Sequence, residues 1–261
     1  MLRKLMKHEL KATARILVPL CLVLLFISVV NRFMYKVGPK EGIFMFINGF
    51  MFVFQIFLIF AVLASTIIFM ITRFYKNLLS DEGYLMFTLP VKSHHLITSK
   101  LTVAVMWTIT SIIVLLSSLL IAFATPESVN NFINGFKSNF AELVIAFDGN
   151  WTLLWIELIS LILLSIVANI LMVYVSIAVG QLFTKHKIIG SFVSYVIFYN
   201  AIQFLLLILL AIFSYTYSGS IDFTHALPRG IFPISISVLL VESIAFYVIT
   251  NYMLKRKLNL D

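Results

Sequence analysis

Six long apolar stretches, separated by shorter polar ones, dominate the hydropathy pattern of the chain. Each has at least about the 20 residues that an α-helix needs to cross the hydrocarbon core of a bilayer. Such uninterrupted runs are typical of segments surrounded by lipid. The predicted spans cover approximately residues 16–34, 43–71, 99–124, 152–180, 190–214 and 231–253. The pattern therefore predicts an all-α membrane protein with a single transmembrane domain over residues 1–261.

The composition excludes an ordinary soluble domain. Hydrophobic residues make up 61% of the chain and charged residues 11%, with a mean hydropathy of +1.05. A soluble domain carries about 25% charged residues. The single cysteine, Cys21, lies in the first apolar run, so one chain can build neither a disulfide framework nor a thiolate metal site. We expect Cys21 to be a small apolar filler.

The distribution of Lys and Arg predicts the orientation of the spans, because cytoplasmic loops retain positive charge. With the N-terminus inside, fourteen of the 19 basic residues fall in cytoplasmic segments and five in outer ones. Both ends of the chain are therefore expected in the cytosol. The net charge of +8 does not indicate nucleic-acid binding, because the basic residues sit at the ends of spans and form no continuous stripe.

Two segments outside the spans have amphipathic helical spacing. In residues 1–14, apolar residues recur at helical intervals opposite Lys and Arg, which predicts a helix lying in the inner membrane interface. A basic leader without regular structure is the alternative. Between spans three and four, aromatic and aliphatic residues from Phe132 to Phe147 follow the same period. Thr125 can cap this second helix and Pro126 can occupy its first turn, so a short outer interfacial helix is expected.

The sequence contains few of the residue patterns that are typical of enzymes. None of the ten glycines is followed by the Lys-Ser or Lys-Thr pair of a phosphate loop, so ATP would have to be hydrolysed by another polypeptide. The five histidines all fall in expected aqueous or interfacial segments without a nearby carboxylate cluster. We therefore expect no catalytic residue and no metal site in this chain.

Two carboxylates lie inside predicted spans, where charge is costly and often functional. Glu242 is about eleven residues into the sixth run, near its middle, and Glu157 is nearer the outer end of the fourth. Glu242 could line a translocation path, or it could be a protonated packing residue bonded to Ser243, Ser237 or Tyr247. Glu157 could line the same path or simply reach the interface.

The segment "RFYKNLLSDEGYLMFTLPVKSHHLITSKL", residues 73–101, mixes large apolar and charged residues on the expected cytoplasmic side. Its many exposed apolar side chains need either a protein partner or the membrane interface. One interpretation is an interfacial connector lying on lipid. The other is a short helix that seats in a cytosolic subunit and passes motion into the bundle.

This segment resembles the permease subunits of type-2 ABC exporters, in particular small bacterial permeases linked to peptide export or resistance. The basic N-terminal helix and the six-span layout support the resemblance. It implies that residues 1–14 form an elbow helix on the inner leaflet and that a coupling helix from about Tyr75 to Phe87 docks on an ATPase subunit. It also implies that residues 125–150 form a short outer helical connection, whereas the polar residues 215–230 do not fit the re-entrant element that many members have between spans five and six. The implied contacts to the ATPase are Tyr75, Leu78, Leu79, Asp81, Glu82, Gly83, Tyr84, Leu85 and Phe87.

The main hypothesis is therefore a catalytically silent permease subunit of an ATP-driven exporter in the bacterial plasma membrane. It would pair with a second permease, identical or related, and with cytosolic ATPases that hold the ATP and Mg. Peptides or other amphipathic, lipid-like molecules are the expected cargo. The alternative is an autonomous secondary transporter, or a membrane-embedded substrate-binding subunit, that uses Glu242 or Glu157.

Overall fold

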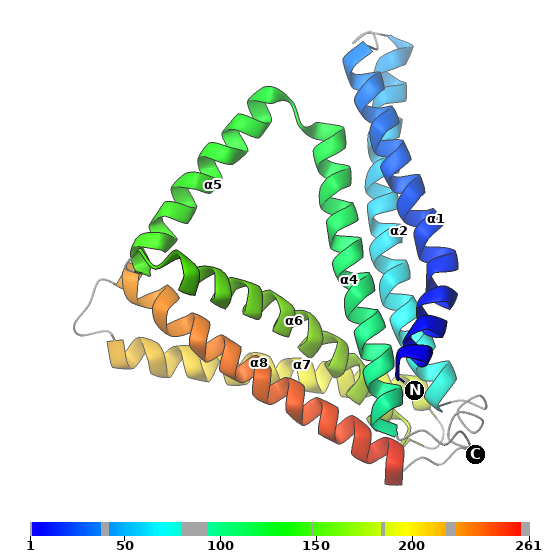
Figure 1. Cartoon of the computed structure of the whole chain (residues 1–261), viewed down its shortest axis with the longest axis vertical. Helices are drawn as coiled ribbons and strands as arrows, with labels where there is room; N and C mark the ends of the chain where they lie inside the picture. The colour runs from blue at the N-terminus through cyan, green and yellow to red at the C-terminus, as the bar shows by residue number, and fades with distance from the viewer. Residues whose placement is uncertain are drawn as a thin grey trace. The chain divides into compact units, whose positions relative to one another are not determined.

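Seven α-helices make up the regular structure of the described part of the chain. A computed structural model describes residues 2–37, 42–79, 93–147, 149–183, 186–217 and 223–256, and in this part no strand occurs. The helices are α1 (Leu2–Val37), α2 (Ile43–Leu79), α4 (Ser93–Phe123), α5 (Pro126–Ala146), α6 (Trp151–Gly180), α7 (Lys187–Tyr217) and α8 (Phe223–Arg256), shown in Figure 1.

Six of these helices, all but α5, are long and apolar enough to cross a membrane. They coincide with the six predicted spans, so the all-α fold and the multi-pass membrane character are confirmed. Several helices extend further than hydropathy indicated, because hydropathy marks only the part that lipid can surround. α2 continues from residue 71 to Leu79 through Arg, Lys and Leu, which are good helix formers. α4 starts at Ser93 instead of residue 99.

The predicted N-terminal helix is present, but it is not a separate element. Residues 2–14 are helical and continue without a break into the first span, as the single 36-residue helix α1. No glycine or proline separates Lys11 from Val18, so nothing in the sequence forces the chain to bend there. Pro19 lies inside α1, where its missing N–H removes one helical hydrogen bond. The elbow geometry therefore stays a prediction.

The chain packs as two compact units. Unit 1 comprises Met1–Arg73 and Thr98–Ile133, and unit 2 comprises Phe74–Ile97 and Asn134–Asp261. The division passes through α2 and α4, so the ends of these two helices nearest residues 80–92 belong to unit 2. A single transmembrane domain stays a prediction.

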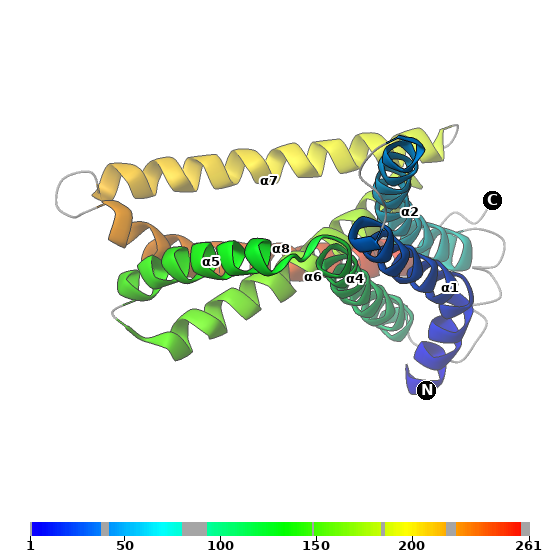
Figure 2. The same cartoon turned by 90° about the horizontal axis from the view of Figure 1, so that it is seen from above.

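Unit 1 is a bundle of α1, α2 and α4, which lie side by side in both views (Figures 1 and 2). Near the chain's N-terminus, Leu17 packs with Val103 and Trp107 of α4. Further along α1, Cys21 and Leu24 pack with Val62 of α2. The expectation that Cys21 is a small apolar filler is thereby confirmed.

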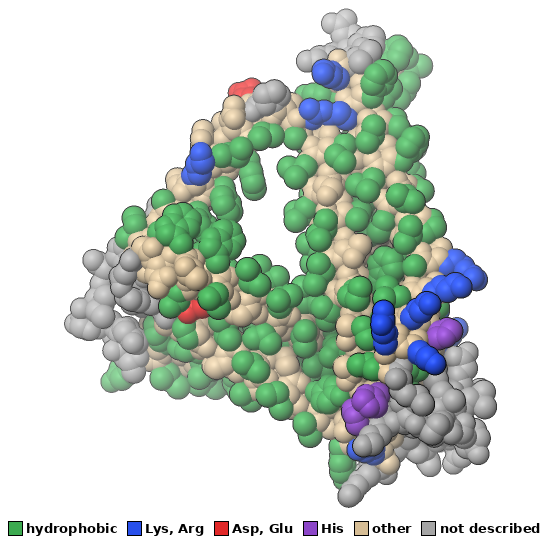
Figure 3. Space-filling model, in the orientation of Figure 1, with side chains coloured by type: hydrophobic (Ala, Val, Ile, Leu, Met, Phe, Trp, Pro, Cys, Tyr) green, Lys and Arg blue, Asp and Glu red, His purple; other side chains and the backbone are tan. Residues whose placement is uncertain are grey.

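The surface of unit 1 has the polarity that a bilayer requires. Large apolar side chains of α2 are exposed along its length, including Phe46 and Phe57 at 81% and 67% exposure. Hydrophobic side chains cover the middle of the bundle, whereas Lys and Arg gather toward its two ends (Figure 3). Exposed phenylalanines at this density would cause a soluble domain to aggregate, and a lipid environment removes that cost.

Unit 2 is built on α6, which packs against α8 and α7. The second half of α6 is buried almost all round, from Ala168 to Gly180. A helix that is apolar on every side in this way lies inside a helical bundle. Gly180 permits close approach to α7, because a Cβ atom there would lie 2.5 Å from the backbone nitrogen of Ser191.

The helix predicted between spans three and four is confirmed as α5. Thr125 caps it as expected: the Ser128 amide donates to the Thr125 hydroxyl at 3.1 Å, and the Thr125 amide donates to the Ser128 hydroxyl at 2.8 Å. Only the second half of its apolar face is buried, where Phe140 and Phe147 pack with Leu154 of α6. Phe132, Ile133 and Phe136 are exposed. Gly149, at φ +75, lets the chain turn into α6.

Candidate coupling site and membrane-embedded polar groups

Both helix ends that flank the predicted coupling segment are anchored within unit 2. At the end of α2, Phe74 and Leu78 are fully buried and Asn77 nearly so. The ring of Phe74 stacks on Tyr174 of α6, with centroids 4.0 Å apart and planes within 10°. This anchor lies in the buried half of α6, so the end of α2 is joined to the core of the unit.

The start of α4 is anchored in a similar way. Leu96 and Ile97 are buried. The hydroxyl of Tyr247 on α8 donates to the backbone carbonyl of His94 at 3.3 Å. The two helix ends on either side of residues 80–92 are therefore both anchored: the end of α2 contacts α6, and the start of α4 contacts α8.

The predicted contact residues divide between described and undescribed positions. Tyr75 and Leu78 lie in the last turns of α2, with Tyr75 half-buried and Leu78 fully buried. Leu79 is the last residue of α2. Asp81, Glu82, Gly83, Tyr84, Leu85 and Phe87 lie outside the described residues. Their assignment to an ATPase contact stays a prediction, and the packing of Leu78 adds an internal role for that side chain.

Glu157 lies on α6 between Leu154 and Leu158, which belong to an apolar cluster with Phe147 and Phe232. One carboxylate oxygen, Oε2, is buried and has no hydrogen-bond partner in the described part of the chain. A buried polar atom without a partner is uncommon and calls for a reason. Whether Glu157 lines a path or reaches the interface stays a prediction.

Glu242 is partly exposed on α8. Two of the hydroxyls expected near it are engaged elsewhere: Ser243 donates to the carbonyl of Leu239 and Ser237 to that of Ile234, both at 2.7 Å. Each serine has a single O–H, so neither proton is available to the Glu242 carboxylate. Each hydroxyl oxygen can still accept a hydrogen bond from a protonated Glu242, so the packing role of Glu242 stays a prediction.

The two carboxylates lie at different levels of unit 2. Phe232 of α8 packs on the cluster that contains Leu154, one turn before Glu157, and Glu242 follows Phe232 by ten residues. At 1.5 Å per residue, the two carboxylates are roughly 10 Å apart along the helices. They cannot act as a pair on one bond. Among the described residues, no group of three or more His, Cys, Asp and Glu side chains could hold a metal ion.

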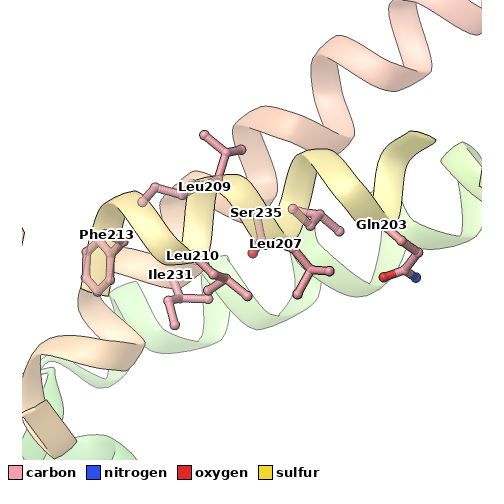
Figure 4. A pocket seen from close by; sticks show the side chains of 9 residues that line it. Gln203, Leu207, Leu209, Leu210, Phe213, Ile231 and Ser235 are labelled. Atoms are coloured by element: carbon pink, nitrogen blue, oxygen red, sulfur yellow. The ribbon is translucent and has the colours of Figure 1, made fainter. Parts of the chain in front are cut away.

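A small cavity of about 210 Å³ lies between α7 and α8 (Figure 4). Leucines from α7 and Ile231 and Ile234 from α8 line it, with Gln203 and Ser235 as its polar residues. None of the described residues that line it is titratable.

Comparison with protein-family models, curated proteins and solved structures finds no match to this chain. The family resemblance therefore rests on the residues of segment 73–101 and on the helix layout.

Sequence reasoning missed a polar network that joins the three helices of unit 1. The hydroxyls of Ser28 and Ser118 lie 2.8 Å apart, and the Gln55 amide nitrogen lies 3.3 Å from each. The amide of Asn31 donates to the Gln55 side-chain oxygen and to the Met51 carbonyl. Gln55 alone interrupts the apolar run "MFVFQIFLIF", and an amide inside a span is itself a signal for interhelical bonding.

A buried ion pair was also missed. Lys100 Nζ lies 2.7 Å from Glu9 Oε1, and the exposed fractions of the two side chains are 4% and 11%. Glu9 is the only acid among the first fourteen residues, which was the available signal. Beside this pair, Trp107 Nε1 donates to the Thr13 hydroxyl at 2.7 Å. These contacts fasten the N-terminal turns of α1 to α4.

Proposed function

We propose that this chain is the transmembrane permease subunit of an ATP-driven ABC exporter in a bacterial plasma membrane. Two copies, or one copy and a related permease, enclose the path. Separate cytosolic subunits bind ATP and Mg and hydrolyse the nucleotide. The cargo is a peptide or another amphipathic, lipid-like molecule that leaves the cell.

The anchoring of the two helix ends around residues 80–92 is the observation that carries this proposal. A loop that merely joins two spans has no need for a buried aromatic stack at one end and a tyrosine bond at the other. A loop that receives force from a motor does need it, because displacement is passed on only through packed, rigid elements. Phe74 and Tyr174 offer that route to α6, and His94 and Tyr247 offer it to α8.

The coupling hypothesis is tested by placing charge in the segment. The tagged chain is purified from its own cells together with the ATPase, and chain-dependent ATP hydrolysis is measured for Tyr84→Asp and Leu85→Asp. Both variants should lose ATPase association and stimulated hydrolysis. Leu182→Asp is the matched control, because Leu182 is an exposed leucine in the link between α6 and α7, on the same predicted side. Unchanged hydrolysis in Tyr84→Asp and Leu85→Asp would reject the coupling assignment.

The oxygen of Glu157 that has no partner among the described residues favours one alternative, a secondary transporter in which a carboxylate carries an ion or proton. That alternative predicts transport by the purified chain in proteoliposomes driven by an ion gradient alone. The exporter predicts no transport until ATPase and nucleotide are both present.

A further inference from the structure

A second cavity, of about 540 Å³, lies within unit 1 where α1 ends, α2 begins and α4 ends. Its volume falls within the range of sites that hold small ligands, and it is larger than a bare inorganic ion needs. Under the predicted orientation it faces the outer leaflet. Its position and chemistry do not depend on the exporter function.

Two cations of α1 line this cavity. Arg32 and Lys36 are four residues apart, so they lie on one face of the helix. Like charges at this spacing repel each other. Among the described residues neither side chain forms an ion pair, and no acidic residue lines the cavity. An anion held between the two would relieve the repulsion.

Arg32 is held in place by the protein. Its guanidinium donates to the backbone carbonyl of Ala124, just past the end of α4. A guanidinium has five N–H donors, so this bond leaves others for a ligand. Asn48 also lines the cavity, and its amide adds a neutral donor that suits glycerol or ester oxygens, whereas Asn31 donates to Gln55 and Met51 within unit 1.

The remaining wall is aromatic and leads to the lipid-facing surface. Phe52 and Phe123 pack edge to face, with ring centroids 5.5 Å apart, and both rings are more than 40% exposed. On the adjoining face of α2, Phe50 stacks on Phe54 at 6.3 Å. An anion-binding site bordered in this way by exposed rings suits a molecule with an acidic head and an apolar tail.

We propose that this cavity binds the anionic, phosphate-bearing head group of an amphiphile in the surrounding leaflet, with its chain lying along the phenylalanines of α2. Asn31 joins this site to the interior of unit 1, because the same amide bonds to Gln55 in the three-helix polar network. Basic residues that merely anchor a helix at the interface would attract anionic lipid generally and would show no saturable site.

The test is lipid titration of the purified chain in a neutral detergent, with bound lipid counted by native mass spectrometry. Phosphatidylglycerol and phosphatidylcholine of equal chain length are compared, with inorganic phosphate as competitor. We expect saturable binding of phosphatidylglycerol, which Lys36→Gln weakens about three- to fivefold, the effect of losing one partly exposed ion pair. Lys137→Gln is the matched control, because Lys137 is an exposed lysine of α5 that does not line the cavity.

Three results would overturn the assignment. Equal binding of the two lipids would show that the cavity does not discriminate between anionic and zwitterionic head groups. Equal weakening by Lys137→Gln would show attraction to net charge instead of a site. Displacement of the lipid by inorganic phosphate at the lipid's own concentration would show that the apolar chain contributes nothing.

Discussion

Lys100 of α4 forms a buried ion pair with Glu9 of α1, with Nζ and Oε1 2.7 Å apart. The pair lies beside the bond from Trp107 to Thr13, so two polar contacts hold the N-terminal turns of α1 against the start of the third span. In a low-dielectric setting each charge depends on the other, because removing one member of a buried ion pair is strongly destabilising.

The first prediction concerns this pair. Lys100→Met should lower the free energy of unfolding by about 3 kcal/mol, because it leaves the Glu9 carboxylate buried without its lysine. The double variant Glu9→Met with Lys100→Met should lose less than the single one, since no charge is then left buried. Thermal unfolding in detergent measures both. Lys11→Met is the control and should be nearly neutral, because Lys11 is an exposed lysine of α1, the helix that carries Glu9. A double variant less stable than Lys100→Met would contradict the buried-charge explanation.

The first helix illustrates what hydropathy can and cannot predict. The apolar run from residue 16 to 34 was sufficient to place a span, and helical periodicity was sufficient to make residues 1–14 helical. The two segments form one helix, which the lack of glycine or proline between Lys11 and Val18 permits, but Glu9 and Thr13 contact residues of α4 that are far away in sequence. Local patterns carry no information about such partners.

Two adjacent serines of α4 provide the second prediction. Ser118 is fully buried and bonds across to α1 and α2, whereas Ser117 bonds only to the Ile113 carbonyl of its own helix. Ser118→Ala should destabilise the chain by about 1 kcal/mol, a typical value for an interhelical bond in a membrane. Ser117→Ala should have almost no effect. Chemical unfolding in mixed micelles gives both values, and equal losses would count against the three-helix network.

The third prediction tests the close approach of α6 and α7. A Cβ atom on Gly180 would lie 2.6 Å from the Cα of Ser191, so Gly180→Ala must push the backbones apart. A loss of about 2 kcal/mol is expected, as for other overpacked sites. Gly49→Ala is the control, because Gly49 is also helical and nothing lies within 4 Å of the added atom. Its stability should be unchanged or slightly higher. A tolerated Gly180→Ala would disprove the close approach.

The fourth prediction concerns the anchor of the coupling segment. Tyr174→Leu removes the ring that stacks on Phe74, an aromatic contact worth about 1 kcal/mol. Amide hydrogen exchange over residues 75–79 should therefore speed up by about fivefold, since the end of α2 opens more readily. Tyr199→Leu is the control, because Tyr199 is an exposed tyrosine of α7. Unaltered exchange in Tyr174→Leu would mean that the stack does not hold this helix end.

Residues 73–101 and the two carboxylates predicted inside spans show a second limit of sequence reasoning: it can single out unusual residues, but it does not reveal their partners. Residues 73–101 could be singled out because large apolar side chains there need a partner, yet nothing local indicated that Phe74 and Leu78 find theirs inside the chain. Glu242 could be singled out by hydropathy alone. Its bonding partners could not be predicted in the same way, because a helical serine readily donates to a carbonyl of the preceding turn, as Ser237 and Ser243 do.

The last prediction separates structure from function at Glu157. Its Oε2 is buried without a partner in the described residues, so Glu157→Leu should raise the free energy of unfolding by about 1 kcal/mol. Glu157→Gln keeps a polar group in the same place and should not.

If the carboxylate serves transport, Glu157→Leu will be the more stable protein and the less active one, and Glu242→Leu shows whether the second acid behaves alike. A loss of stability in Glu157→Leu would instead mean that the oxygen has a partner outside the described residues, such as a bound cation or a second copy of the chain. Measuring unfolding and export on the same preparations distinguishes a carboxylate kept for its chemistry from one kept for its contacts.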